Sequence, residues 1–331
     1  MRKEFSVNEL YKGIIANNRI ILSKAITLIE STRKLDQEKA EKLLQMCMPH
    51  SGNSIRIGIT GVPGVGKSTF IESFGLFALN KGKKLAVLAI DPSSQLNKGS
   101  ILGDKTRMND LSSNKNAFIR PTASAGSLGG VAKATHESII LFEAAGYDTI
   151  FIETVGVGQS ETTVKNMVDC FLLLLLAGAG DELQGIKRGI MEMADILVIN
   201  KSDGENEKKA KQAAAQLKNA IHLFPPTSSG WIPQVELCSA LNKKNLDGIW
   251  DKIENYIITL KTKGYFEQTR NTQSKYWLHQ IIQDKLKADF YLNNKIQQEL
   301  TLIENEIVKG TTSPTQAAIK LFSEYKKESK K

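Results

Sequence analysis

A glycine-rich segment, Gly61-Val-Pro-Gly-Val-Gly-Lys67-Ser68-Thr69, constrains the fold of this chain more than any other feature. It fits the pattern G-x-x-x-x-G-K-[ST] and lies between a short apolar run, Ile55 to Thr60, and a stretch of helical spacing, Ser68 to Lys81. Glycines let such a loop fold round a phosphate, and the amino end of the following helix favours an anion. The segment therefore predicts a strand, a phosphate-binding loop and a helix in succession.

The whole loop is a candidate nucleoside-phosphate site, and its strand-loop-helix setting disfavours the alternative of a glycine-rich helix start without a ligand. Lys67 would place a positive charge near the β and γ phosphate oxygens, and we expect it to be catalytic. The Ser68 hydroxyl would ligate Mg²⁺. The residues expected to hold the nucleotide here are Gly61, Val62, Pro63, Gly64, Val65, Gly66, Lys67, Ser68 and Thr69.

Short apolar runs alternate with helical stretches through the middle of the chain. Most of these runs are apolar along their whole length, which is typical of strands buried on both faces of a sheet. The pattern predicts the α/β class, with a doubly wound, mainly parallel sheet of the P-loop NTPase type. The expected strands are Ile55 to Thr60, Leu85 to Ile90, Thr149 to Glu153, Phe171 to Ala177, Ile196 to Asn200 and Val235 to Ser239, and the expected helices are Ser68 to Lys81, Val131 to Ala145, Glu205 to His222 and Leu246 to Leu260.

Helical additions flank this middle part. A capping box, Ser6 to Glu9, opens a helical stretch to about residue 48, and Pro49 to Asn53 ends it. A long helical pattern, Ser274 to Val308, precedes a helix started by Pro314. We expect a helical N-terminal extension (1–52), a nucleotide-binding domain (53–263) and a helical C-terminal arm (264–331). The arm must bury its apolar stripe on this chain or on a second copy, and we favour a homodimer.

Composition narrows the possible partners and surroundings. The chain has 331 residues, and 44 Lys plus Arg against 35 Asp plus Glu give a net charge of +9. The C-terminal basic residues form no compact stripe, so we expect no nucleic-acid partner. Cys47, Cys170 and Cys238 lack metal-site spacing and are expected to be reduced core residues. The most apolar run, Phe171 to Ala179, is too short to span a bilayer, so we expect no membrane partner and a cytoplasmic protein.

Asn200-Lys201-Ser202-Asp203 follows an apolar strand and has the form N-K-x-D, which is typical of P-loop proteins that bind guanine. An ionised Asp203 can accept from both N1–H and the 2-amino group of guanine, whereas adenine offers neither donor there. Asn200 would hold the loop, and the Lys201 stem would cover the ring. Ser239 and Ala240, at the end of the last strand, are similar to the S-A element that reaches guanine O6.

A second acidic strand end, Glu153-Thr-Val-Gly156, corresponds to the D-x-x-G element of Ras-like GTPases. Glu153 would help to place Mg²⁺ or its waters and is a candidate catalytic residue, and the Gly156 N–H would face the γ-phosphate. Val157 stands where those proteins carry the glutamine that orients water, so we expect slow intrinsic hydrolysis. Gln159 is an offset candidate for that role.

Asp91 and Asp104 are two further carboxylates that could approach the metal. Asp91 precedes Pro92 at the end of the second expected strand, and it could equally cap a turn. Asp104 could equally be a solvated loop charge. Position alone leaves both alternatives open.

The chain contains, in this order, the segments GVPGVGKST, DPSS, ILGDKTRM, ETVGVGQSE, AGAGDELQGIK and NKSD. In this order and spacing they resemble those of the P-loop GTPases that chaperone adenosylcobalamin-dependent acyl-CoA mutases, the MeaB or ArgK type. The resemblance covers residues 20 to 260 well and the C-terminal arm in general character. The chain departs from the usual pattern of the family at Lys98 and Ala123, and these departures bear on the expected rate of hydrolysis and partner contacts but not on nucleotide binding.

The resemblance implies a homodimeric GTPase that docks on a mutase of the methylmalonyl-CoA type, gates cobalamin loading and protects the mutase. It implies GTP, GDP and Mg²⁺ as ligands, with Asp91, Asp104 and Glu153 around the metal, and Asp91 joins the candidate catalytic residues. It further implies that 181–187 forms a switch facing the mutase. Three alternatives stay open: a transport-associated ATPase or kinase of the ArgK label, a nickel- or zinc-delivery GTPase, and a GTP-bound scaffold with negligible turnover.

Overall fold

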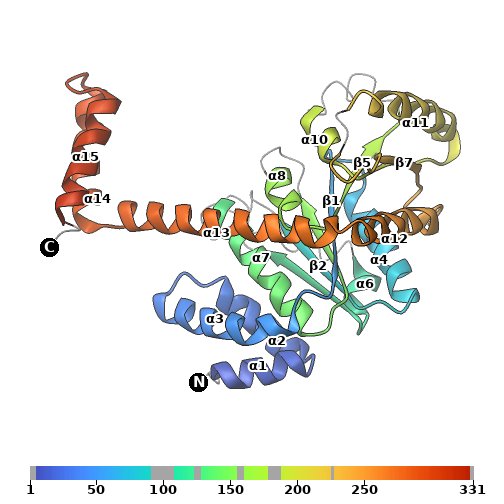
Figure 1. Ribbon diagram of the computed structural model, residues 1–331, viewed down its shortest axis with the longest axis horizontal. Coiled ribbons are helices and arrows are strands. Elements are labelled where there is room, and N and C mark those ends of the chain that lie inside the picture. Colours follow the sequence, from blue (N-terminus) through green and yellow to red (C-terminus); the bar gives the residue numbers. More distant parts are fainter. Residues whose placement is uncertain are drawn as a thin grey trace. The chain divides into compact units, whose positions relative to one another are not determined.

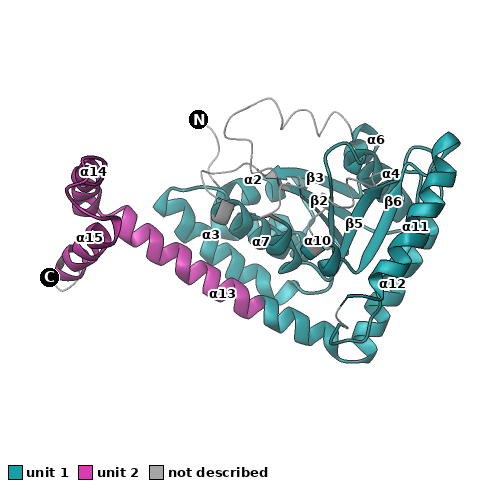
Figure 2. Cartoon of the chain, turned by 90° about the horizontal axis from the view of Figure 1, so that it is seen from above, with its two compact units in different colours: residues 1–273 teal, residues 274–331 magenta. Residues whose placement is uncertain are grey.

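The computed structural model describes residues 5–90, 108–122, 128–154, 160–177, 188–224 and 227–328. The chain divides into two compact units, residues 1–273 and residues 274–331 (Figure 2). The first unit contains the sheet and the phosphate loop, and the regular elements in the described part of the second unit are all helices. The expected domain boundary between residues 263 and 264 stays a prediction.

A parallel sheet forms the centre of the first unit (Figure 1). Its seven strands run in the order β3-β2-β4-β1-β5-β6-β7, and every neighbouring pair is parallel. The expected doubly wound α/β fold is confirmed. The strands are β1 (Ile55–Gly61), β2 (Leu85–Ile90), β3 (Ala117–Thr122), β4 (Thr149–Thr154), β5 (Cys170–Leu176), β6 (Ile196–Asn200) and β7 (Gln234–Leu237).

Helices cover both faces of this sheet. Ile57 and Ile59 of β1 face the helices that share their apolar core, namely α4, α6 and α12. Gly58 points to the opposite face, where an added Cβ would lie 3.1 Å from Val164 of α8. The helices of the first unit that follow β1 are α4 (Lys67–Asn80), α6 (Asn109–Ser113), α7 (Leu128–Ala144), α8 (Ser160–Lys165), α10 (Arg188–Met193), η2 (Gly204–Asn206), α11 (Glu207–Ile221) and α12 (Leu246–Thr262).

Strand β3 has no counterpart among the strands expected from the sequence. Within the described part of the chain it pairs with β2 alone, from Leu85↔Ala117 to Ile90↔Thr122, and so forms one edge of the sheet. Its sequence, AFIRPT, contains Arg120 and Pro121, which do not suit a strand paired on both sides. An edge strand tolerates both residues, and this explains why an analysis based on fully apolar runs overlooks it.

An aromatic cluster packs α4 onto the sheet and onto α12. The Phe74 ring centroid lies 5.0 Å from that of Phe70, 5.6 Å from that of Phe151 on β4 and 5.7 Å from that of Trp250 on α12. All four side chains are fully buried. Since α4 begins at the phosphate loop, this cluster fixes the direction of the helix that follows the loop.

Three N-terminal helices, α1 (Val7–Ile15), α2 (Arg19–Ile29) and α3 (Lys34–Cys47), pack on one another and on α7, and the short η1 (Met48–His50) follows them. The expected capping box is present: Glu9 N–H donates to the Ser6 hydroxyl, and the Glu9 carboxylate accepts from Ser6 N–H at 2.8 Å. The bundle therefore starts where the sequence predicts.

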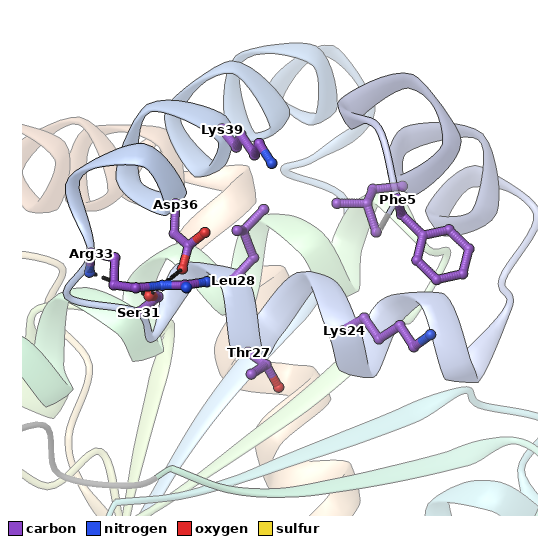
Figure 3. A pocket seen from close by; sticks show the side chains of 9 residues that line it. Phe5, Lys24, Thr27, Leu28, Ser31, Arg33, Asp36 and Lys39 are labelled. Atoms are coloured by element: carbon purple, nitrogen blue, oxygen red, sulfur yellow. Dashed lines mark hydrogen bonds and ion pairs between the residues drawn. The ribbon is translucent and has the colours of Figure 1, made fainter. Parts of the chain in front are cut away.

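A pocket of about 340 Å³ opens among these three helices (Figure 3). Asp36 is the one carboxylate among its described lining residues, and it accepts from the Ser31 hydroxyl at 2.6 Å and from Arg33 Nε at 2.8 Å. These two bonds lower the pKa of Asp36 below its usual value, and the bond from Ser31 has the larger effect. The described lining residues all lie outside the phosphate loop. They are Phe5, Leu10, Lys24, Thr27, Leu28, Ser31, Arg33, Asp36 and Lys39.

The amino end of β1 is tied to the start of α13 (Tyr265–Tyr291) within the first unit. Arg270 donates from Nε and from one terminal nitrogen to the two oxygens of Asp169, each at 2.8 Å. The same carboxylate accepts from the backbone N–H of Arg56 at 2.8 Å. The Asp169 side chain is 2% exposed, so solvent screens this two-point ion pair little.

The second unit contains the rest of α13 together with α14 (Asn294–Val308) and α15 (Pro314–Glu328). The long helical pattern from residue 274 to 308 is thus two helices, because the Asn293 side chain caps α14 by accepting from Lys295 N–H and Ile296 N–H. Pro314 starts α15 as expected. A small core of their own joins these helices: Phe290, Ile296, Ile303, Ala317 and Leu321.

All three cysteines are unpaired thiols within the fold, as expected. Burial raises the pKa of Cys47 to about 11 and that of Cys238 to about 12. Burial is also the main reason why the pKa of Cys170 lies well above its usual value. Across the described ranges, no helix has the length and apolar character that crossing a bilayer requires.

We predict that Phe74→Ala lowers the free energy of unfolding by about 3–5 kcal/mol, because it opens a cavity at the centre of the aromatic cluster. Ile258→Ala on α12 is the matched control, since that side chain is 60% exposed, and it should change stability by only about 0.5 kcal/mol. Urea unfolding followed by circular dichroism measures both. Equal losses in the two variants would contradict the packing role of Phe74.

Candidate functional site

The phosphate loop lies at the carboxyl edge of the sheet. Strand β1 ends at Gly61, and α4 begins six residues later at Lys67. Because all strands are parallel, β4, β6 and β7 end at the same edge, which is where open α/β sheets bind their ligands. The geometry brings the loop, Glu153, the N-K-x-D segment and the Ser239 segment to one side of the sheet.

Two glycines of the loop occupy positions that no other residue would fill easily. Gly61 has φ +155°, and a Cβ there would lie 2.6 Å from the Leu174 carbonyl oxygen of β5. Gly66 has φ +92°, and its Cβ would lie 3.0 Å from Nδ2 of Asn200. Gly66 is also the N-cap of α4 and provides no side-chain cap. The amino end of α4 is therefore suited to an anion.

Two lysines reach the carbonyl groups of this loop. Lys67 Nζ donates to the Gly61 carbonyl at 2.7 Å and more weakly to that of Val62 at 3.4 Å. Lys201 Nζ donates to the Gly64 carbonyl at 2.9 Å. Both ammonium groups therefore border the loop, where a phosphate would meet two positive charges.

Asn200 joins three separate segments of the chain at the end of β6. Its Nδ2 donates to the Val65 carbonyl at 2.9 Å, and its Oδ1 accepts from Ala240 N–H at 3.1 Å. The side chain is 2% exposed, so neither bond competes with bulk water. One amide thus holds the phosphate loop, the N-K-x-D segment and the Ser239 segment in fixed relative positions.

Further bonds hold the segment that follows β7. The Ser73 hydroxyl of α4 donates to the Ala240 carbonyl at 2.7 Å, and Ser202 N–H donates to the Cys238 carbonyl at 2.9 Å. The carboxylate of Asp203 accepts from the Ser239 hydroxyl and from Nδ2 of Asn242. The segment after β7 therefore holds the Asp203 carboxylate in place.

Glu153 and Ser68 are the described members of the expected metal site. Glu153 pairs with Ile59 of β1 and Ala89 of β2, so its side chain lies on the face of the sheet that α4 covers. It is 7% exposed, and Ser68 lies in the first turn of α4. A carboxylate and a hydroxyl oxygen suit Mg²⁺, which keeps several waters and takes few protein ligands.

Several expected site residues lie outside the described residues: Asp91, Asp104, Gly156 and Gln159, together with the 181–187 segment and the departures at Lys98 and Ala123. Among the residues that the structure does describe, no group of three or more His, Cys, Asp or Glu could hold a metal ion. The described site accordingly comprises the phosphate loop, the base segment, Glu153 and the segment after β7.

A family model for the "Methylmalonyl Co-A mutase-associated GTPase MeaB" matches residues 22–295, which include every one of these segments. The chain belongs to the MeaB family. It is similar to a probable GTPase of Mycobacterium tuberculosis, with 47% identity over 95% of this chain and 93% of that protein. MeaB-family membership makes it a P-loop GTPase that binds guanine nucleotides.

Two further curated relatives match nearly the whole chain. The GTPase ArgK of Escherichia coli is 42% identical over 98% of this chain and 99% of its own length. The mitochondrial methylmalonic aciduria type A homolog of Mus musculus is 43% identical over 97% of this chain and 80% of its own length. The crystal structure of a LAO/AO transport system kinase has 36% identity and a TM-score of 0.76, with 98% of both chains covered.

The structure of this MeaB-family chain also shows residues that the sequence analysis did not select. Ser73 and Asn242 hold the segment after β7, and Thr154 donates from Oγ1 to Oγ1 of Thr60 at 2.6 Å where β4 and β1 approach the loop. A serine inside a helix and an asparagine in a turn are both ordinary residues for their places. Only the folded arrangement shows their partners.

We predict that Gly66→Ala weakens GDP binding about tenfold or more, equivalent to about 1.4 kcal/mol, because its Cβ would press on Asn200 at the amino end of α4. Gly82→Ala is the matched control: it has φ +82° and an added Cβ would meet nothing within 4 Å. Both should lose similar stability from the positive φ, about 1–2 kcal/mol. Equal GDP affinity in the two variants, measured by calorimetry, would refute the role given to the Gly66–Asn200 contact.

Proposed function

We propose that this chain hydrolyses GTP as the chaperone of an adenosylcobalamin-dependent acyl-CoA mutase of the methylmalonyl-CoA type, gating cofactor loading and protecting the mutase. The observation that carries the nucleotide part is the Asn200 side chain, which joins the phosphate loop to both base-binding segments. A chain that joins these three segments through one buried amide is built to hold a nucleoside phosphate across them.

For the phosphates, we assign the nine loop residues 61–69 and the amino end of α4. Lys67 would exchange its carbonyl partners for phosphate oxygens, and it lies within reach of the loop already. Mg²⁺, when bound, neutralises charge that develops on the β and γ oxygens. Ser68 and Glu153, with Asp91 and Asp104, are the residues that we propose would hold it.

For the base, we assign Asn200, Lys201, Asp203, Ser239 and Ala240. Asp203 would accept from N1–H and the 2-amino group of guanine, and the Ala240 N–H already lies in the same hydrogen-bonded unit as Asn200. A site that pairs buried polar groups with a ligand rejects a base that leaves them unpaired. Guanine is therefore the base that this pocket favours.

Hydrolysis is proposed to be slow. The side chain of Val157 cannot hydrogen-bond a water at the position where Ras-like proteins carry glutamine, and Gly156 would face the γ-phosphate. Lys67, Glu153, Asp91 and Gln159 are the residues to which we assign catalytic roles. A partner that completes the site would then raise the rate, as suits a switch that is read by another protein.

Two observations support the mutase as that partner. The matching family is described as associated with methylmalonyl-CoA mutase, and one relative is named for methylmalonic aciduria.

We propose that the chain works as a homodimer in the cytoplasm. On α13 an apolar row at helical spacing, Leu278, Ile282 and Leu286, is 57%, 44% and 63% exposed, which suits a second copy.

A second candidate function is that of a transport-associated kinase, which the name of the 36% identical solved protein favours. Such a protein would transfer the γ-phosphoryl group to a protein acceptor. It would also have no need for a carboxylate that selects guanine. Base preference therefore separates the two functions.

We predict that Asp203→Asn lowers GDP affinity about 10²-fold and raises that for xanthosine diphosphate, because an amide donor complements the 2-carbonyl of xanthine. The Lys67→Ala variant should bind neither GDP nor xanthosine diphosphate tightly, because it lacks the positive charge that the phosphate groups of both nucleotides need. Calorimetry with Mg²⁺ measures all the affinities. A wild-type preference for ADP over GDP would overturn the guanine assignment and favour the kinase.

We predict that the methylmalonyl-CoA mutase of the same organism accelerates single-turnover hydrolysis of GTP by the wild-type protein. The physical reason is that the partner completes a catalytic site that lacks a water-orienting glutamine. We also expect the mutase to form a complex with the GTP-loaded wild-type protein and not with the Lys67→Ala variant. An unchanged rate together with no complex in size-exclusion chromatography would refute the chaperone role.

A further inference from the structure

A closed set of hydrogen bonds surrounds the base-binding carboxylate. Asn242 donates twice: its backbone N–H donates to the Ser239 hydroxyl at 3.1 Å, and its Nδ2 donates to Oδ2 of Asp203 at 3.2 Å. The Ser239 hydroxyl in turn donates to the same Oδ2. Because the serine oxygen already accepts from Asn242, its own hydrogen is directed to the carboxylate.

Both donors thus reach one oxygen of Asp203. Oδ2 accepts one hydrogen bond from the Ser239 hydroxyl and one from the Asn242 amide. Oδ1 accepts from no side chain in the part of the chain that the structure describes. Two donors from one turn leave the carboxylate little freedom to rotate, and they distinguish its two oxygens.

We propose that Asn242 is a specificity-determining residue of the guanine pocket, which positions the Asp203 carboxylate for the 2-amino group. This inference rests on the proposed guanine binding and adds a residue to it. Asn242 acts through Asp203, so it is a positioning residue. It follows Ser239 and Ala240 by a few positions, on the turn between β7 and α12.

Orientation matters because guanine offers two donors side by side, N1–H and the 2-amino group. A carboxylate bonds both only when its plane coincides with the plane of the base. Without the Asn242 amide, the carboxylate is held by Ser239 alone and can rotate to favour the single bond to N1–H. The second bond, to the 2-amino group, is then the one that weakens.

Inosine diphosphate isolates that second bond, since it keeps N1–H and lacks the 2-amino group. The ratio of the dissociation constants for inosine and guanosine diphosphates therefore measures how well Asp203 contacts the 2-amino group. A general loosening of the site changes both constants together and leaves the ratio unchanged. The ratio consequently distinguishes positioning from a merely structural role.

The test measures this ratio by calorimetry, with Mg²⁺, for the full-length wild type and for Asn242→Ala and Asn242→Asp. Asn242→Ala should lower the ratio about 3- to 10-fold, as expected for one hydrogen bond to a charged group at an exposed site. Asn242→Asp keeps the size of the side chain but sets a second negative charge beside Asp203, and it should lower the ratio further.

Asn305→Ala is the control, because Asn305 is an exposed asparagine whose Nδ2 bonds within its own helix, to the Thr301 carbonyl at 3.0 Å. It should keep the wild-type ratio. A wild-type protein that prefers guanine, with an unchanged ratio in both Asn242 variants, would overturn the role of Asn242 alone. A wild type without guanine preference would instead overturn the proposed function.

Discussion

The pair of hydrogen bonds made by the Asn200 side chain is the interaction on which the nucleotide site depends. Its amide fixes the Val65 carbonyl on one side and the Ala240 N–H on the other. Strand β6 places this amide at the carboxyl edge of the sheet, between the segments that it joins. The phosphate loop and the segment after β7 are therefore joined through one buried group, and neither can shift without affecting the other.

The sheet determines why such a junction is possible. Parallel pairing from β3 to β7 sends every loop that follows a strand to the same edge, so segments far apart in the sequence meet there. The Phe74 cluster then fixes α4 behind the loop, and Ser73 of the same helix reaches the Ala240 carbonyl. Packing and polar bonding thus support the same arrangement. The match to the MeaB family and the similarity to a probable GTPase agree with a nucleotide site at this edge of the sheet.

Much of this could be predicted from the sequence, because glycine positions and fully apolar runs carry strong local signals. The phosphate loop, the N-K-x-D segment and six strands follow from such signals. Strand β3 could not, since Arg120 and Pro121 are compatible only with an edge. Nor could the partners of Asn242, because a turn asparagine contacts Asp203 only once the chain has folded. Assignments at the metal and γ-phosphate positions stay predictions.

The native thiol groups of this protein should react slowly with reagents that modify cysteine. Cys47, Cys170 and Cys238 are buried, and their raised pKa values keep them protonated, whereas the thiolate is the form that reacts with alkylating reagents and oxidants. A cysteine placed on the surface by substitution would be modified far faster than these three. Fluorophores and spin labels could thus be attached at single chosen points without first removing the native sulfur atoms.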